Sequence, residues 1–149
     1  MLFKTLLSIH ILSAIIGIGA TFMFPLILAM PKTLKGVQSA VQIVNKGANY
    51  PKIGSVLLLL TGLGMGLIKT SLFQQGWFIT AIILLLTAVL IYVLRILPRL
   101  KEAQHLVDDV EGDVIPEPYY VIKANIKPFM ITASTIDIVI ILLMIWKPF

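Results

Sequence analysis

Residues 2–30 read LFKTLLSIHILSAIIGIGATFMFPLILAM and are almost wholly apolar. At about 1.5 Å per residue, a helix of this length exceeds the ~30 Å hydrocarbon core of a bilayer. Lys4 stands at its start, and His10 is the one ionisable residue well inside it. On a helix, His10 shares a face with Ser13 and Gly17, whereas the adjoining face is aliphatic. The stretch therefore predicts a membrane-spanning helix with one side for protein and one for lipid.

The composition indicates that much of the chain faces lipid. Of the 149 residues, 58% are hydrophobic and 13% are charged, whereas soluble domains carry about 25% charged residues. A soluble core of this length could not hide so much apolar surface. We therefore predict an all-α polytopic membrane protein, a four-transmembrane-helix bundle that forms one domain over residues 1–149. Its expected spans are residues 5–30, 52–68, 77–97 and 126–146.

Prolines and charges mark the segments between the expected spans. Pro31 and Pro98 are expected to end the first and third spans, because proline disrupts a helix interior. Residues 33–49 carry valines on one helical face and predict an interfacial helix or a helical extension. Residues 99–125 then form the one substantial loop, which holds most of the acidic residues.

Several function classes are disfavoured by what the chain lacks. It has no cysteine, which excludes disulfides, thiol catalysis and cysteine-ligated metals. The acidic residues 108–113 do not follow the pattern of a calcium loop, so no protein metal site is predicted. No Ser-His-Asp set can be assembled at one surface, so no catalytic residue is assigned. The sequence leaves open whether the protein is an enzyme and favours that it is not.

The distribution of basic residues predicts an orientation. An even number of spans places both termini on one side, which holds Lys4, Lys69 and Lys147; the other nine of the twelve Lys and Arg lie on the opposite side. The positive-inside rule then puts both termini outside the cytoplasmic (inner) membrane, with Trp77 and Trp146 at the outer boundary. The lipid bilayer is the expected partner, and the sequence is compatible with a homo-oligomer. Nucleic acid is not expected, because no basic stripe lies on a soluble surface.

One polar residue in each expected span falls at a similar depth. Counted from the outer ends at ~1.5 Å per residue, four residues lie about 12–15 Å below the outer surface: His10, Thr61, Thr87 and Asp137. A charge at that depth costs at least ~2.5 kcal/mol, so Asp137 is expected to be protonated, paired or hydrated. His10 is its predicted partner. The pair is either a structural hydrogen bond or part of a site for a ligand, a proton or a cofactor.

Small residues predict where helices approach closely. Gly62 and Gly66 form a small-xxx-small pair in the second span, and Ser13 and Gly17 lie on the small face of the first. We interpret all four as helix-packing residues. A phosphate-binding glycine loop is excluded, because irregular backbone exposed to hydrocarbon would leave its polar groups unsatisfied.

Short motifs along the chain resemble one known family. They are LLSIHIL and GIG in the first span, YPKI and LTGL in the second, GW before the third, and the closing MIWKP at residues 144–148. Together they are similar to a family of predicted bacterial integral membrane proteins, the domain-of-unknown-function family numbered 2269. The resemblance covers essentially the whole chain and implies no established activity.

The first span is also distantly similar to that of copper-resistance D and HemJ-type membrane proteins. In those families a span-one histidine precedes an aromatic residue and a glycine; here His10 and Gly19 match, and Gly17 stands where the aromatic residue would be. The resemblance implies haem b with His10 as an axial ligand, in an oxidoreductase or electron-transfer protein. Candidate second ligands are Met65, Met130 and Met144. The remaining alternatives are an uncharacterised membrane protein with a polar site around His10 and Asp137, and a small proton-coupled transporter that uses Asp137.

Overall fold

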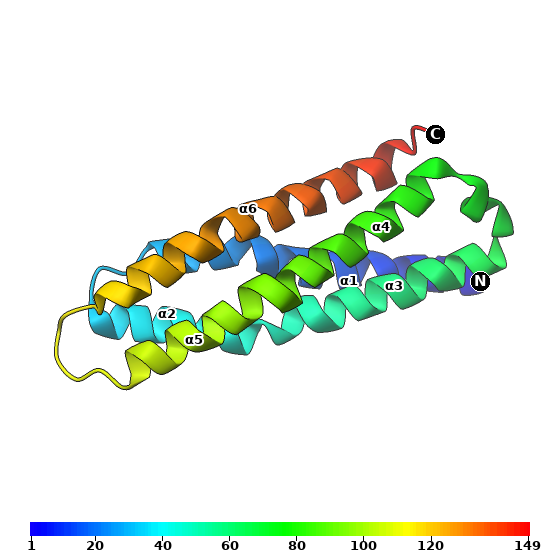
Figure 1. Cartoon of the computed structure of the whole chain (residues 1–149). Helices are drawn as coiled ribbons and strands as arrows, with labels where there is room; N and C mark the ends of the chain where they lie inside the picture. The colour runs from blue at the N-terminus through cyan, green and yellow to red at the C-terminus, as the bar shows by residue number, and fades with distance from the viewer.

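The computed structural model describes all 149 residues, and every regular element is helical (Figure 1). The elements are α1 (Leu2–Ala29), α2 (Leu34–Gly47), α3 (Asn49–Ile68), the short turn η1 (Thr70–Gln74), α4 (Gly76–Ile91), the π-helical turn η2 (Tyr92–Ile96), α5 (Leu97–Asp108) and α6 (Glu117–Trp146). The stretches long and apolar enough to cross a membrane are Leu2–Ala29, Leu34–Ile68, Gly76–Asp108 and Glu117–Trp146. The prediction of an all-α, four-helix membrane bundle is confirmed.

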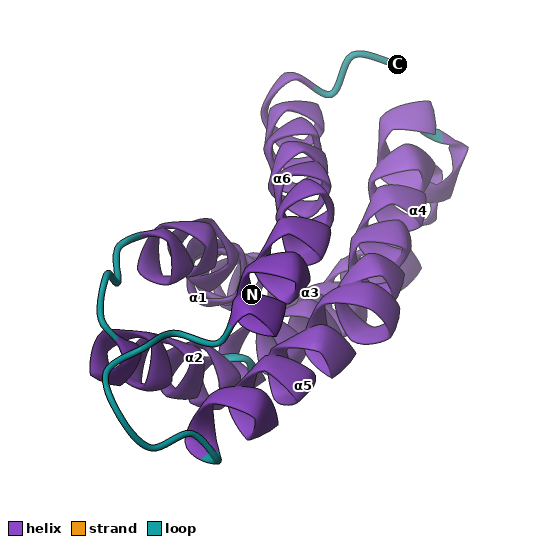
Figure 2. Cartoon of the chain, turned by 60° about the vertical axis from the view of Figure 1, so that its left-hand side comes forward, coloured by secondary structure: helices purple, strands orange, loops and turns teal.

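The four membrane-spanning stretches are arranged as two pairs. α1 packs most extensively on α3, and α4 packs most extensively on α6. Figure 1 shows the two pairs spreading apart toward the end that carries both termini, which we call the terminal end. At the opposite end, which we call the polar end, α2 and α5 lie side by side (Figure 2). The pairs therefore hold together most closely away from the termini.

The contact between α1 and α3 is made by glycine against glycine. A Cβ atom on Gly54 would lie 2.6 Å from the Gly17 Cα and 3.0 Å from the Ser13 carbonyl oxygen. Ser13 is buried, and its hydroxyl donates to the Ile9 carbonyl at 2.7 Å, so it brings no unpaired donor into the contact. Between helices in lipid, such backbone approach supplies van der Waals energy that larger side chains prevent. Gly54 is the residue of this contact that the sequence pattern did not predict.

Gly62 and Gly66 face side chains instead of a second helix backbone. A Cβ atom on Gly62 would lie 3.4 Å from Cε1 of His10. On Gly66 it would lie 2.7 Å from the Phe73 ring, and the Phe78 ring is also adjacent. These glycines make room for one imidazole and two aromatic rings at the terminal end.

The third membrane-spanning stretch, Gly76–Asp108, continues through Pro98 without ending. The π-helical turn η2 directly precedes Leu97, and α5 carries Pro98 in its first turn and continues to Asp108. Proline is tolerated in a first turn because that N–H has no intrahelical partner to lose, and a π turn locally widens the preceding helix. The prediction that Pro98 ends the helix was wrong, and the loop after it spans only residues 109–116. Residues 33–49 form the predicted helical extension, since α2 leads through Ala48 into α3.

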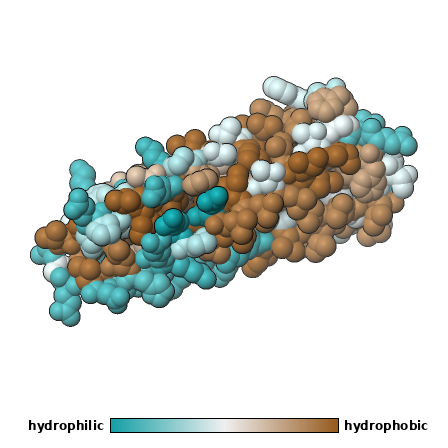
Figure 3. All heavy atoms as spheres, viewed as in Figure 1, coloured by the Kyte–Doolittle hydropathy of each residue, from teal (hydrophilic) through white to brown (hydrophobic).

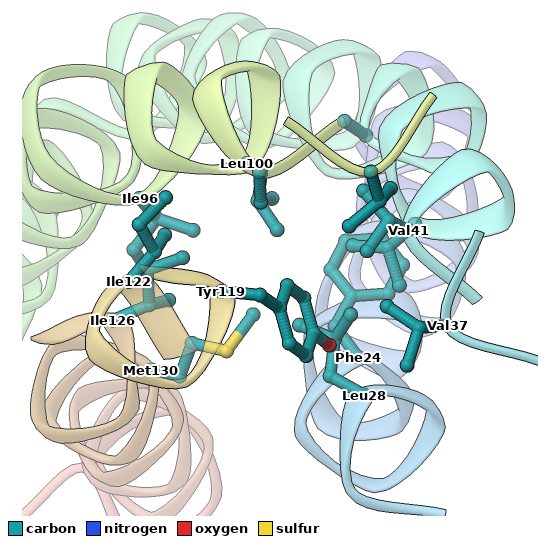
Figure 4. Close-up of a cluster of buried hydrophobic side chains, with 14 of the residues drawn as sticks. Phe24, Leu28, Val37, Val41, Ile96, Leu100, Tyr119, Ile122, Ile126 and Met130 are labelled. Atoms are coloured by element: carbon teal, nitrogen blue, oxygen red, sulfur yellow. The ribbon is translucent and has the colours of Figure 1, made fainter. Parts of the chain in front are cut away.

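The polar end is packed like the core of a soluble protein. A cluster of 17 buried side chains from α1, α2, η2, α5 and α6 meets there (Figure 4). Asn45 and Gln38 of α2 donate to the carbonyls of Leu100 and Val107 in α5, at 3.0 and 2.8 Å. Figure 3 shows hydrophilic residues around this end and hydrophobic residues over most of the remaining surface. The lipid-facing surface therefore lies toward the terminal end.

The C-terminal tail closes the terminal end against α4. The N–H of Trp77 donates to the carbonyl of Phe149 at 2.9 Å, and the Phe149 ring lies where a side chain on Gly76 would stand. Lys147 turns the chain with a left-handed backbone, and its Nζ lies 5.6 Å from the centre of the Trp77 ring. Trp77 is therefore buried under the tail, whereas Trp146 is exposed, as a residue of an interfacial aromatic belt would be.

We predict that Gly54→Ala lowers the free energy of unfolding by about 1–3 kcal/mol, because the new methyl group meets backbone atoms and forces α1 and α3 apart. Thermal unfolding of the purified protein in mild detergent measures this. Gly19→Ala is the matched control, since nothing lies within 4 Å of a Cβ atom there. Equal effects of the two variants would contradict the glycine contact.

Candidate functional site

His10 is held by α3 through one ring nitrogen. Its Nδ1 lies 2.8 Å from Oγ1 of Thr61, and that same oxygen lies 2.6 Å from the Leu57 carbonyl. A hydroxyl has one hydrogen to donate, so Thr61 donates to Leu57 and accepts from Nδ1–H of His10. Nδ1 of His10 therefore carries a hydrogen. In the neutral ring the other nitrogen, Nε2, is an acceptor, and no hydrogen bond of the structure uses it.

The imidazole stands at the wall of a large apolar groove. The groove has a volume of about 720 Å³ and lies between α1 and α6, with α3 and α4 behind it. Of the 23 residues that line it, 20 are hydrophobic, and the ionisable ones are His10 and Lys147. Its lining comes from both helix pairs, α1 with α3 and α4 with α6. A volume of this size falls within the usual range of small-molecule sites, about 300–1,000 Å³.

The three methionines separate into two groups. Met65 of α3 and Met144 of α6 line the groove with His10. Met130 instead belongs to the buried cluster at the polar end (Figure 4). Met130 therefore cannot act with His10, whereas the other two share its groove.

Asp137 bonds to α1 at a different level from His10. Its Oδ2 lies 2.9 Å from Oγ1 of Thr21, which is eleven residues beyond His10 along the same helix, or about 16 Å. The predicted contact between His10 and Asp137 was wrong. Equal depth along two helices implies contact only if the helices are parallel, whereas α1 and α6 meet at Thr21 and diverge toward the terminal end (Figure 1). Thr87 does not join either residue, because it is exposed and donates to the Ile83 carbonyl of its own helix.

The geometry at Thr21 accommodates a protonated carboxyl. Oγ1 of Thr21 also lies 2.7 Å from the Ile18 carbonyl, and its single hydrogen serves one acceptor at a time. Both contacts are satisfied together when Asp137 carries a proton and donates to Thr21. A neutral carboxyl also avoids the cost of a buried charge in hydrocarbon. Asp137 is buried and lines a cavity of about 300 Å³ between the helix pairs, with Ser55 and Tyr92. This cavity borders the His10 groove, with which it shares Ile18, Leu58, Leu59 and Leu85.

The sequence matches a known protein family over nearly its full length. Residues 4–148 match the family described as "Predicted integral membrane protein (DUF2269)". The chain belongs to the DUF2269 family. No curated protein and no solved structure matches it. The resemblance drawn from the short motifs is thus confirmed over nearly the full length of this DUF2269 protein, which is an integral membrane protein and resides in a lipid bilayer. The similarity to copper-resistance D and HemJ-type proteins stays a prediction.

We predict that Asp137 is energetically coupled to Thr21 and not to His10. In a double-mutant cycle, Asp137→Leu and Thr21→Val remove the same hydrogen bond, so their effects on the free energy of unfolding should deviate from additivity by more than about 0.5 kcal/mol. Asp137→Leu and His10→Leu act at separate places and should add within about 0.5 kcal/mol. Unfolding in mild detergent measures both cycles. A larger coupling for the His10 cycle would restore the pairing that the structure rejects.

Proposed function

We propose that this DUF2269 protein binds an apolar, planar ligand in the groove beside His10, and that haem b is the ligand whose chemistry fits the groove best. The observation that carries the proposal is the free Nε2 of His10 at the wall of an apolar groove of about 720 Å³. Imidazole is a common axial ligand of haem iron. Nδ1–H already donates to Thr61, and such a second bond orients a metal-binding histidine and raises its basicity.

The residues around the groove fit a ligand that already contains a metal ion together with most of the atoms that coordinate it. No group of three or more His, Cys, Asp or Glu side chains that could hold a metal ion gathers in the chain. A porphyrin supplies four nitrogens and needs one or two axial ligands from the protein. Met65 and Met144 line the same groove, and a thioether is a second type of group that would hold the haem iron. The Lys147 ammonium would be the cation for the propionates.

Such a site would serve electron transfer or an oxidoreductase reaction. Haem supplies reversible one-electron chemistry when bound. In this protein His10 would hold the haem, the aliphatic lining of the groove would exclude water, and Lys147 would anchor the propionates. The apolar surroundings and the axial ligand are the features through which a protein adjusts the potential of a haem.

We predict that the protein, purified in mild detergent and supplied with haemin, shows a Soret band that His10→Ala abolishes. His105→Ala is the matched control, because the His105 side chain is exposed on α5, outside the groove. Thr61→Val should keep the band but weaken haem binding by about 10–100-fold, through loss of the bond to Nδ1. A protein that stays colourless with haemin, or an unchanged spectrum of His10→Ala, would rule out haem at this site.

We also propose that the protein lies in the cytoplasmic membrane with both termini outside. The proposal is supported by the three basic residues at the terminal end against nine on the other side. We predict that a tag after Phe149 is accessible to a membrane-impermeant reagent in intact cells. A tag inserted at Glu111, in the loop of residues 109–116, should react only after the cells are opened. The reverse labelling pattern would overturn this orientation.

A further inference from the structure

A second apolar cavity lies on the other side of the Thr21–Asp137 contact. It has a volume of about 390 Å³ and lies between α1 and α6 toward the polar end. Pro25 and Leu28 of α1 and Ile126 and Met130 of α6 form its sides, and α2 and α5 form its floor. Ten of its 13 lining residues are hydrophobic. This cavity is separate from the His10 groove, with which it shares no lining residue.

Two lysines line this cavity, one turn apart on α6. Lys123 is half-buried and Lys127 is exposed. Neither is paired with a carboxylate, since the one ion pair of the structure joins Arg99 and Glu102. Long basic side chains beside an apolar cavity place their stems against it and their charges at its rim. The rim is therefore positively charged and without a partner in the protein.

The depth of these lysines corresponds to the headgroup region. From Ile126 to Trp146 of α6, about 20 residues span ~30 Å, the thickness of the hydrocarbon core. Lys127 and Lys123 thus lie at the boundary toward the polar end, and the apolar cavity extends from them between the helices.

We propose that this cavity binds one molecule of an anionic phospholipid, with an acyl chain between α1 and α6 and the phosphate on Lys123 and Lys127. Apolar lining alone would accept any lipid chain, and lysines alone would accept any anion. The two together select a molecule that is both apolar and negatively charged. Basic pockets between transmembrane helices recognise anionic headgroups by this combination.

The test is thermal unfolding in mild detergent with added phosphatidylglycerol or with phosphatidylcholine of the same acyl chains. We expect phosphatidylglycerol to raise the unfolding temperature and phosphatidylcholine to leave it nearly unchanged. The double variant Lys123→Gln, Lys127→Gln should lose this increase. The double variant Lys46→Gln, Lys101→Gln is the matched control: it removes the same charge from exposed positions of α2 and α5 outside the cavity, and it should keep the increase.

Further arms distinguish a lipid site from a general effect of charge. The variant Lys123→Arg, Lys127→Arg should retain the increase, which shows that a loss in the Gln variant comes from charge and not from misfolding. Inorganic phosphate and glycerol phosphate, which lack acyl chains, should not reproduce it. The proposal is overturned if these soluble anions act as well as the lipid, if the control variant loses the increase as fully, or if both phospholipids act alike. None of these outcomes depends on haem binding at His10.

Discussion

The approach of Gly17 to Gly54 determines how the rest of the bundle is placed. In lipid no hydrophobic force drives helices together, so backbone contact and hydrogen bonds must do it. Each glycine lies seven residues, or about two turns, from one partner of the His10–Thr61 bond. The two antiparallel helices are therefore in register over both contacts. With α1 committed to α3, the pair α4–α6 is free to diverge from it, and the groove beside His10 is the space that results.

The two ends of the molecule are suited to different solvents, the polar end to water and the terminal end to lipid. At the polar end, α2 and α5 bury valines and leucines against each other, as amphipathic helices in water do. At the terminal end, large aliphatic side chains remain exposed and meet lipid. The π turn η2 lies between the lipid-facing helix α4 and the water-facing amphipathic helix α5. It allows the helix to continue from α4 into α5 despite Pro98.

Hydropathy predicted the fold class, because four long apolar runs leave few other solutions. It could not predict which polar residues meet, since that depends on tilt and splay, which arise from packing between helices far apart in sequence. The His10–Asp137 pairing failed for this reason. Gly54 was missed because it lacks a small residue one turn away on its own helix to complete a recognisable motif. The His10–Thr61 bond could have been predicted from the sequence once Gly17 and Gly54 are known to touch. His10 lies seven residues before Gly17, and Thr61 lies seven residues after Gly54 on the antiparallel helix.

The tail over α4 bears on the order in which the chain assembles. The first N–H groups of a helix need acceptors from outside it, and for Trp77 that acceptor is the Phe149 carbonyl, 72 residues later. During synthesis, α1 and α3 can join as soon as Gly54 has entered the membrane. The start of α4, in contrast, gains this protein acceptor for its N–H only after the last helix has been inserted. The bundle is therefore completed at the terminal end last, after both helix pairs have formed.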